Sequence, residues 1–204
     1  MLKKTFFDLI FIYSNDSAVA NKLWNEIELN YSSKNRFYHT LSHLENLLNQ
    51  LLEVKSEIKD WNCILFTLFN HDIIYKSTKS DNEEKSADFA VERMIQLSVS
   101  KLVIESCKNQ ILATKSHLSN ENFDTNYFLD ADLSVLGQGW NSYSDYFKNV
   151  RKEYSIYPDI LYNSGRKKVL KHFLAMEKIF KTDYFFRKFE LNARQNLQKE
   201  LNLI

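Results

Sequence analysis

The chain has 204 residues, 44% of them hydrophobic, which is enough for one domain with a substantial core. It contains only 3 Gly and 1 Pro, so a fold of many short strands and tight hairpins is disfavoured, and long helices are favoured. The formal net charge of +1 excludes a nucleic-acid surface that depends on a large basic excess and leaves room only for a local basic groove.

Apolar residues recur at helical spacing along most of the chain, and short polar runs separate the apolar segments. The first polar run, Ser14–Ser17, is expected to cap a helix that continues through Trp24 toward Tyr31. Asp60 and Thr182 are placed to cap two later helices. The helices expected after the first polar breaks are 36–53, 61–71, 82–97, 101–115, 127–136, 141–156, 159–180 and 183–203. Without a repeat or a linker, this pattern predicts a single all-α domain over residues 1–204.

The cysteines and the N-terminal segment indicate the cellular compartment in which the protein is expected. Cys63 and Cys107 stand singly in apolar stretches, so we expect buried free thiols of a reducing compartment. Asp8 interrupts the first apolar run and no small-residue cleavage site follows, so a signal peptide is not expected. No stretch approaches the ~20 apolar residues of a membrane span. The sequence therefore predicts a cytoplasmic protein with no membrane partner.

The five histidines are unevenly placed. His39 and His43 lie four residues apart within the expected helix 36–53, so they are predicted to share a face. His71 and Asp72 are adjacent where an apolar helix gives way to a polar loop, and His117 ends a later helix. Taken alone, a histidine pair at this spacing is more often hydrogen-bonded or exposed than metal-bound.

Two aspartates, Asp130 and Asp132, are predicted to lie on nearly opposite sides of the helix 127–136, which Gly137 is placed to stop. The residues one turn before and after Asp132 are apolar, whereas those around Asp130 are mixed. A carboxylate in an apolar stripe must be paired or bound to a cation, because burying it bare costs on the order of several kcal/mol. Asp132 is therefore the better ligand candidate, with a helix-to-helix tether as the alternative of equal weight.

Three runs in order, Tyr38–Leu44, Phe69–Asp72 and Asp130–Ser134, resemble the HD superfamily of metal-dependent phosphohydrolases. This resemblance implies an HD-type helical bundle in which the metal ligands are His43, His71, Asp72 and Asp132. The first and third runs are also similar to those of cyclic-nucleotide phosphodiesterases, which implies that His39 protonates the leaving group.

The chain is more closely similar to a small bacterial group of predicted HD phosphohydrolases, from about residue 20 to the end. The recurrent elements of that group match Asn35–His39, Asp81–Ala87, Ala113–His117, Phe128–Gly137, Val150–Tyr154, Gly165–Arg166 and Ala193–Leu197. The ordered set is more specific than the short His-Asp motif alone.

Two imidazoles and two carboxylates suit Mn²⁺, Fe²⁺, Ni²⁺ or Mg²⁺ in octahedral geometry, and they also accept Zn²⁺. Open coordination positions would activate a water molecule near neutral pH and polarise a phosphoryl oxygen. We therefore expect metal-assisted hydrolysis of a phosphate ester, either a nucleotide or a related small metabolite. A non-catalytic metal- or nucleotide-binding module and a plain helical interaction protein are the alternatives.

Neighbouring side chains are candidates for the proton transfers. His39 or His117 is expected to donate a proton to the leaving oxygen, and His117 alternatively helps to hold a second ion. Glu83 and Glu84 are candidates to orient the attacking water. Their place in the first turn of a helix is explained equally well by the helix dipole.

Basic residues near these motifs are candidates for binding the substrate phosphate, namely Arg36, Lys76 and Lys115. A solvated surface position is the alternative for each of them. For three later arginines, spacing leaves open whether they bind substrate or pair with acids; these are Arg151, Arg166 and Arg194.

Overall fold

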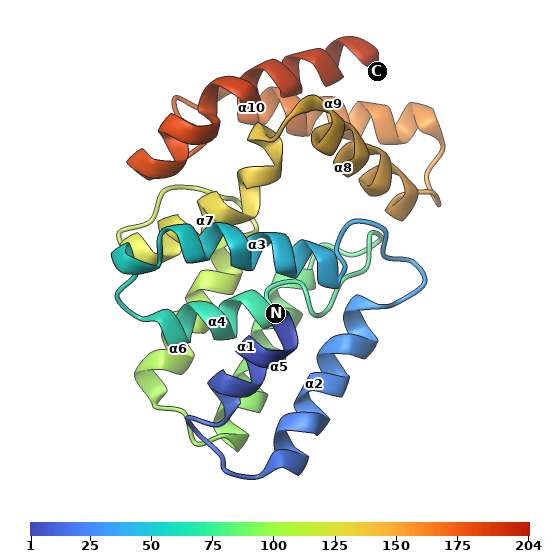
Figure 1. Ribbon diagram of the computed structural model, residues 1–204. Coiled ribbons are helices and arrows are strands. Elements are labelled where there is room, and N and C mark those ends of the chain that lie inside the picture. Colours follow the sequence, from blue (N-terminus) through green and yellow to red (C-terminus); the bar gives the residue numbers. More distant parts are fainter. The chain divides into compact units, whose positions relative to one another are not determined.

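The computed structural model describes residues 1–204 and confirms the expected all-α fold class, with ten α-helices, two short 3-10 helices and no strand (Figure 1). The helices are α1 Leu2–Ile10, α2 Ser17–Tyr31, α3 Leu41–Glu53, η1 Lys55–Glu57, α4 Trp61–Asn70, α5 Asn82–Gln96, α6 Lys101–Ala113, α7 Phe123–Leu133, η2 Ser134–Gly137, α8 Trp140–Glu153, α9 Asp159–Ala175 and α10 Asp183–Leu203. None of these helices combines the length and the apolar character that crossing a membrane requires.

The chain forms two compact units, Met1–Leu129 and Asp130–Ile204. Helix α7 runs without interruption through the boundary between them. The expectation of a single domain stays a prediction, and the two units are described one at a time.

Helix α4 is the centre of the first unit. Its residues from Cys63 to Asn70 are all buried, as expected for a helix that is apolar almost all round. Helices α1, α3, α5 and α6 pack against it, and α5 also packs along α6 (Figure 1). This packing places the polar residues that directly follow α4 at the edge of the core of the first unit.

Two helix starts in this unit are explained by capping side chains, as the sequence predicts. The Asp16 carboxylate accepts the Ala18 N–H at 2.7 Å, and the Asp60 carboxylate accepts the Cys63 N–H at 2.9 Å. Both predicted free thiols are also confirmed, since Cys63 and Cys107 are buried and unpaired.

The helix expected over 36–53 begins only at Leu41, so that prediction is wrong at its start. Thr40 is the N-cap and is extended, with φ −114° and ψ 178°. The bend before it is held by Arg36, whose guanidinium donates to the His39 carbonyl oxygen at 3.1 Å. His39 therefore precedes the helix and does not share a helical face with His43.

In the second unit, α10 packs against η2 and α9, and α8 packs against η2. A buried ion pair joins two of these helices: the Arg166 guanidinium donates to the Glu200 carboxylate at 2.7 and 2.9 Å. The hydroxyl of the fully buried Tyr143 donates to the same carboxylate. Satisfying both charges of a buried pair in this way is what makes its burial tolerable.

Helix α9 ends at Ala175, five residues before the predicted end at 180. The Glu190 carboxylate accepts the N–H groups of Ile179 and Phe180 at 3.1–3.2 Å, and the Arg194 guanidinium donates to the Met176 carbonyl oxygen at 2.8 Å. These side chains on α10 replace the helical hydrogen bonds that the segment would otherwise make.

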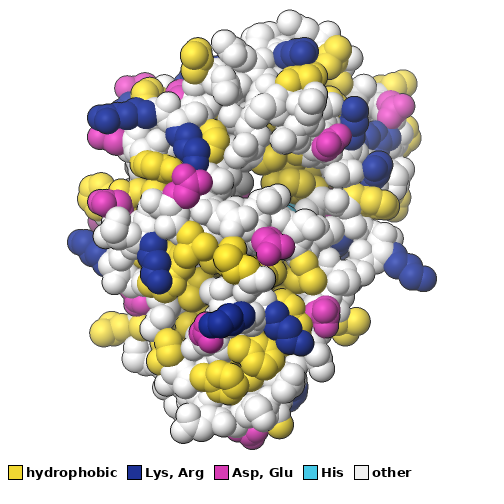
Figure 2. All heavy atoms as spheres, viewed as in Figure 1, with side chains coloured by type: hydrophobic (Ala, Val, Ile, Leu, Met, Phe, Trp, Pro, Cys, Tyr) yellow, Lys and Arg dark blue, Asp and Glu magenta, His cyan; other side chains and the backbone are white.

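The surface carries acidic, basic and hydrophobic side chains interspersed over the face drawn in Figure 2. This agrees with 27 Lys and Arg against 26 Asp and Glu in the sequence.

Candidate metal centre

His71 follows the last residue of α4, and its side chain is only 1% exposed. Its Nδ1 lies 3.0 Å from the carbonyl oxygen of Leu68. Because a carbonyl oxygen only accepts, Nδ1 must carry the proton and donate it. In the neutral form of this ring the lone pair is on Nε2, which is the tautomer that metal-ligating histidines use.

His43, in the first turn of α3, turns its ring toward His71. The two Nε2 atoms lie 3.2 Å apart, and both side chains are buried. The Asp72 Oδ2 atom lies 3.2 Å from the Nε2 of His71 and 3.9 Å from that of His43. Lone pairs that converge this closely repel one another unless a proton or a metal ion lies among them.

His39 approaches the same carboxylate from the segment before α3. Its Nε2 atom lies 3.9 Å from Asp72 Oδ2, and its side chain is 19% exposed. The ring lies against that of Tyr75, with centroids 4.3 Å apart and an interplanar angle of 31°. His39 therefore belongs to the cluster, although it does not share a helical face with His43.

The Asp72 carboxylate is ionised in this setting. Burial, the largest single influence, raises its pKa, but the neighbouring His71, His39 and His43 together outweigh burial and hold the pKa below the ordinary value. The three histidines thus favour the ionised form of the Asp72 carboxylate.

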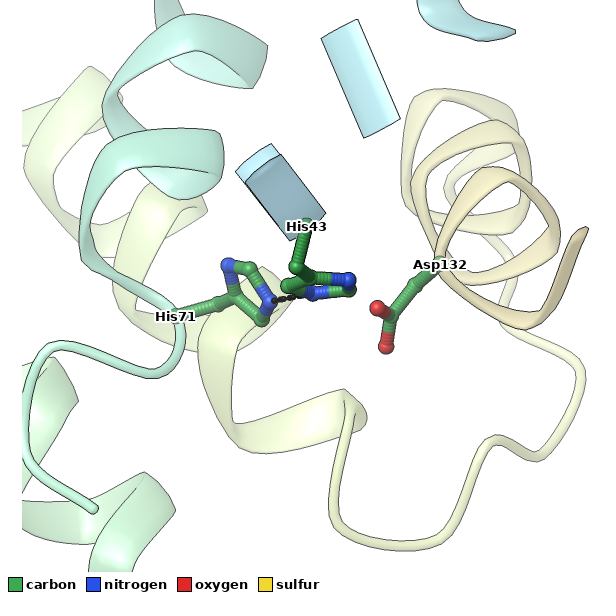
Figure 3. A group of neighbouring side chains, drawn as sticks. All are labelled: His43, His71 and Asp132. Atoms are coloured by element: carbon green, nitrogen blue, oxygen red, sulfur yellow. Dashed lines mark hydrogen bonds between the residues drawn. The ribbon is translucent and has the colours of Figure 1, made fainter. Parts of the chain in front are cut away.

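Asp132 lies farther along the chain, on α7. The first turns of this helix belong to the first unit, where the Phe128 ring packs edge-on to His71 with centroids 5.4 Å apart. The same helix continues to Asp132, one turn beyond Phe128. One ligand atom from each of His43, His71 and Asp132 lies within 4.8 Å of the others, and Figure 3 shows these three side chains.

These separations are compatible with a coordination sphere. Nitrogen and oxygen ligands stand about 2.1 Å from a divalent transition-metal ion, so neighbours in an octahedron are about 3.0 Å apart and opposite ligands about 4.2 Å apart. The distances of 3.2 Å and 3.9 Å fall close to these two values. The residues present therefore fit a divalent ion.

The two aspartates of α7 differ in burial, but in the opposite sense to the prediction, and the ligand role of Asp132 stays a prediction. Asp130, and not Asp132, is the fully buried one, with 0% exposure, whereas Asp132 is half-buried. The Asp130 carboxylate accepts the N–H groups of Lys181 and Thr182 at 2.9 and 2.7 Å and also the Thr182 hydroxyl. Asp130 therefore tethers α7 to the segment that precedes α10. The burial predicted from the apolar stripe is wrong, because this distant segment covers the Asp130 side of the helix.

Arg36 was a phosphate-binding candidate, but its guanidinium donates to backbone carbonyl oxygens. It bonds to those of His39, Asp72 and Ile73 at 3.1, 2.7 and 2.8 Å, and only 8% of the residue is exposed. These contacts disfavour a role in binding phosphate and give Arg36 a structural task beside the site.

Lys115 and Glu84 bind each other. The Lys115 ammonium donates to the Glu84 carboxylate and to the Ser80 carbonyl oxygen, the latter at 2.8 Å. Their pKa values respond accordingly: the hydrogen bond from Lys115 lowers that of Glu84, and Glu84 raises that of Lys115. This pair joins the first turn of α5 to the segment that follows α6, and a role in catalysis stays a prediction.

The remaining candidates lie on the same loops. Lys76 is exposed, and its backbone N–H and carbonyl groups both bond to the Asn82 side chain at 3.0 Å. Glu83 lies half-buried in the first turn of α5. His117 follows α6 in a left-handed conformation with φ 51°. Their roles in binding or catalysis stay predictions.

The three later arginines pair with acids. Arg166 binds Glu200 as described above, Arg194 binds Glu190 at 2.7 Å, and Arg151 binds Asp159 at 2.7 Å.

Sequence analysis did not single out Tyr31 or Tyr75, although both contact the cluster. The Tyr31 hydroxyl accepts the Asp72 N–H at 3.3 Å, and Tyr75 packs on His39. Their only sequence signal is that Tyr75 lies three residues after Asp72.

Comparisons of the chain with protein-family models, with curated proteins and with solved structures find no match.

Proposed function

We propose that this chain is a metal-dependent hydrolase of a phosphate ester, with a nucleotide or a related small phosphorylated metabolite as substrate. The observation that carries the proposal is the convergence of two buried histidine nitrogens and an ionised aspartate, at 3.2 and 3.9 Å, beside Asp132. The resemblance of the ordered motifs to the HD superfamily supports the same proposal.

The proposed ligands are His43, His71, Asp72 and Asp132. This mixed nitrogen and oxygen set suits Mn²⁺, Fe²⁺, Ni²⁺, Mg²⁺ or Zn²⁺. An ion bound there would polarise a phosphoryl oxygen and make a water molecule a better nucleophile. The two buried cysteines, both unpaired, accord with a reducing compartment such as the cytoplasm.

The protein's own contribution beyond binding is a proton for the leaving oxygen. His39 is the stronger candidate, because its Nε2 atom lies 3.9 Å from the Asp72 carboxylate and its side chain is partly exposed. The negative charge of Asp72 stabilises a protonated imidazole at that distance. Tyr75 packs on the ring and restricts the directions in which the proton can be delivered.

The test is hydrolysis of bis-p-nitrophenyl phosphate, p-nitrophenyl phosphate and a panel of nucleotides by Mn²⁺-loaded protein. We expect turnover that Asp72→Ala abolishes and that His39→Ala reduces by about 10²–10⁴-fold without loss of the metal. Asp88→Ala is the matched control, because Asp88 is an exposed aspartate on α5. Metal-loaded protein that hydrolyses none of these compounds would contradict the proposal and favour a non-catalytic binding module.

A further inference from the structure

The backbone that carries Asp72 is held by side chains from outside its own segment. Helix α4 ends at Asn70, and the next carbonyl groups have no helical partner. Two of these, on Asp72 and Ile73, accept hydrogen bonds from the Arg36 guanidinium at 2.7 and 2.8 Å. A positive charge at the C-terminal end of a helix is also favoured by the helix dipole.

The N–H group of Asp72, in the preceding peptide, is held as well. The Asp72 N–H donates to the Tyr31 hydroxyl at 3.3 Å, and Tyr31 is only 1% exposed. The Arg36 guanidinium lies over the Tyr31 ring, 4.7 Å from its centroid. Arg36 and Tyr31 thus form one packed unit that binds both the N–H and the carbonyl of Asp72.

Arg36 reaches a second residue of the cluster. It donates to the His39 carbonyl oxygen at 3.1 Å, and its guanidinium lies 5.5 Å from the centroid of the Tyr75 ring. Tyr75 in turn packs on the His39 imidazole. A single buried guanidinium therefore joins the backbone of the proposed metal ligand to that of the proposed proton donor.

We propose that Arg36 is a positioning residue that, with Tyr31, fixes Asp72 and His39 relative to each other and so sets the metal affinity of the cluster. This inference rests on the proposed function. The planar fork of a guanidinium can serve several carbonyl oxygens at once, which an ammonium group cannot do in the same geometry. Residues that orient metal ligands change metal affinity by about 10–100-fold when they are removed.

The experiment compares full-length wild type, Arg36→Met, Arg36→Lys and Arg93→Met. Arg93 is a matched control, because it is a partly buried arginine of the same unit that stacks over Phe89 at 4.2 Å and pairs with Glu26 at 2.7 Å. We expect calorimetry with Mn²⁺ to show binding weakened by about 10–100-fold in Arg36→Met, partly recovered in Arg36→Lys and unchanged in Arg93→Met. Equal Mn²⁺ affinity in wild type and Arg36→Met would overturn the inference, and Arg36→Lys decides it in the same way if Arg36→Met does not fold.

Amide hydrogen exchange in metal-free protein separates this inference from the proposed function. In Arg36→Met and Arg36→Lys, we expect the Asp72 amide to exchange faster than in wild type, while the Met94 amide on α5 keeps its rate. If wild type binds no Mn²⁺, the proposed function fails, and exchange alone decides whether Arg36 positions Asp72. An unchanged Asp72 rate in both variants would overturn the positioning role.

Discussion

The Nε2 atoms of His43 and His71 face each other at 3.2 Å, while the other ring nitrogen of His71 is bound to the Leu68 carbonyl oxygen. This arrangement leaves His71 a single way to present its lone pair, which is toward His43 and the Asp72 carboxylate. Packing alone does not call for two imidazoles and a carboxylate in such an orientation. A shared proton or a shared cation would account for it, and the proposed function takes the cation.

The two aspartates of α7, Asp130 and Asp132, are expected to differ in what their removal changes: stability for the first and metal binding for the second. Asp130→Ala leaves one part-buried donor of Lys181 and two buried donors of Thr182 without their acceptor, so we expect it to lower the free energy of unfolding by on the order of 3 kcal/mol. Asp132→Ala is expected to cost less stability and to weaken Mn²⁺ binding. Urea unfolding of metal-free protein together with calorimetry checks both, and the reverse ranking of the two variants would contradict these roles.

The ion pair between Glu84 and Lys115, called the clasp below, leads to a pH-dependent prediction. The hydrogen bond from Lys115 holds the Glu84 pKa below its reference value of 4.5, so the clasp is fully formed above that pH and is lost as pH falls through the lowered pKa. In Lys115→Met, we expect the Glu84 pKa to rise toward 4.5, as measured by carbon NMR of the side-chain carboxyl.

Lys85→Met is the control for this titration, because Lys85 pairs with Asp81 at 2.7 Å. It is expected to raise the pKa of Asp81, which the Lys85 hydrogen bond lowers, and to leave the Lys115 clasp in place. A Glu84 titration that is identical in wild type and Lys115→Met would refute the clasp.

Ser98 ends α5 in the left-handed region, with φ 56°. The Val99 N–H bonds to the Met94 carbonyl oxygen at 3.0 Å and the Ser98 N–H to that of Ile95 at 2.9 Å, which is the Schellman pattern that favours glycine. We expect Ser98→Gly to raise the free energy of unfolding by about 0.5–1 kcal/mol and Ser98→Val to lower it. Chemical denaturation measures both, and a destabilised Ser98→Gly would be inconsistent with this conformation.

Gly137 allows α10 to approach η2. A Cβ atom at this position would lie 2.7 Å from the Phe189 carbonyl oxygen and 2.8 Å from its Cα. Gly137→Ala is therefore expected to lower the free energy of unfolding by about 1–3 kcal/mol. Gly165→Ala is the control: nothing lies within 4 Å of its Cβ position inside α9, so we expect it to stabilise by about 0.5–1 kcal/mol. A neutral Gly137→Ala would refute the close approach.

Local chemistry explains which features could be predicted from the sequence. The helix-capping side chains of Asp16 and Asp60 act within two or three residues, and the drop from the apolar α4 into a polar loop placed His71 and Asp72 at a helix end. The helix predicted over 127–136 instead spans Phe123–Leu133, so Gly137 does not stop it. Gly137 ends the 3-10 helix η2, where close packing and not a left-handed φ requires a glycine.

The features that were missed depend on partners far along the chain. The bend that removes His39 from α3 involves Arg36, whose bonds reach Asp72 and Ile73, 36 and 37 residues away. The burial of Asp130 depends on Lys181 and Thr182, more than 50 residues on. Neither periodicity nor spacing encodes such partners.

The metal content of the protein tests the central claim most directly. Elemental analysis of wild type, purified without a chelator or a metal-affinity tag and dialysed against Mn²⁺, should find about one ion per chain. His71→Ala and Asp72→Asn should lose it, and His172→Ala, an exposed histidine of α9, should retain it. Wild type without metal, or His71→Ala with the full wild-type content, would contradict the account.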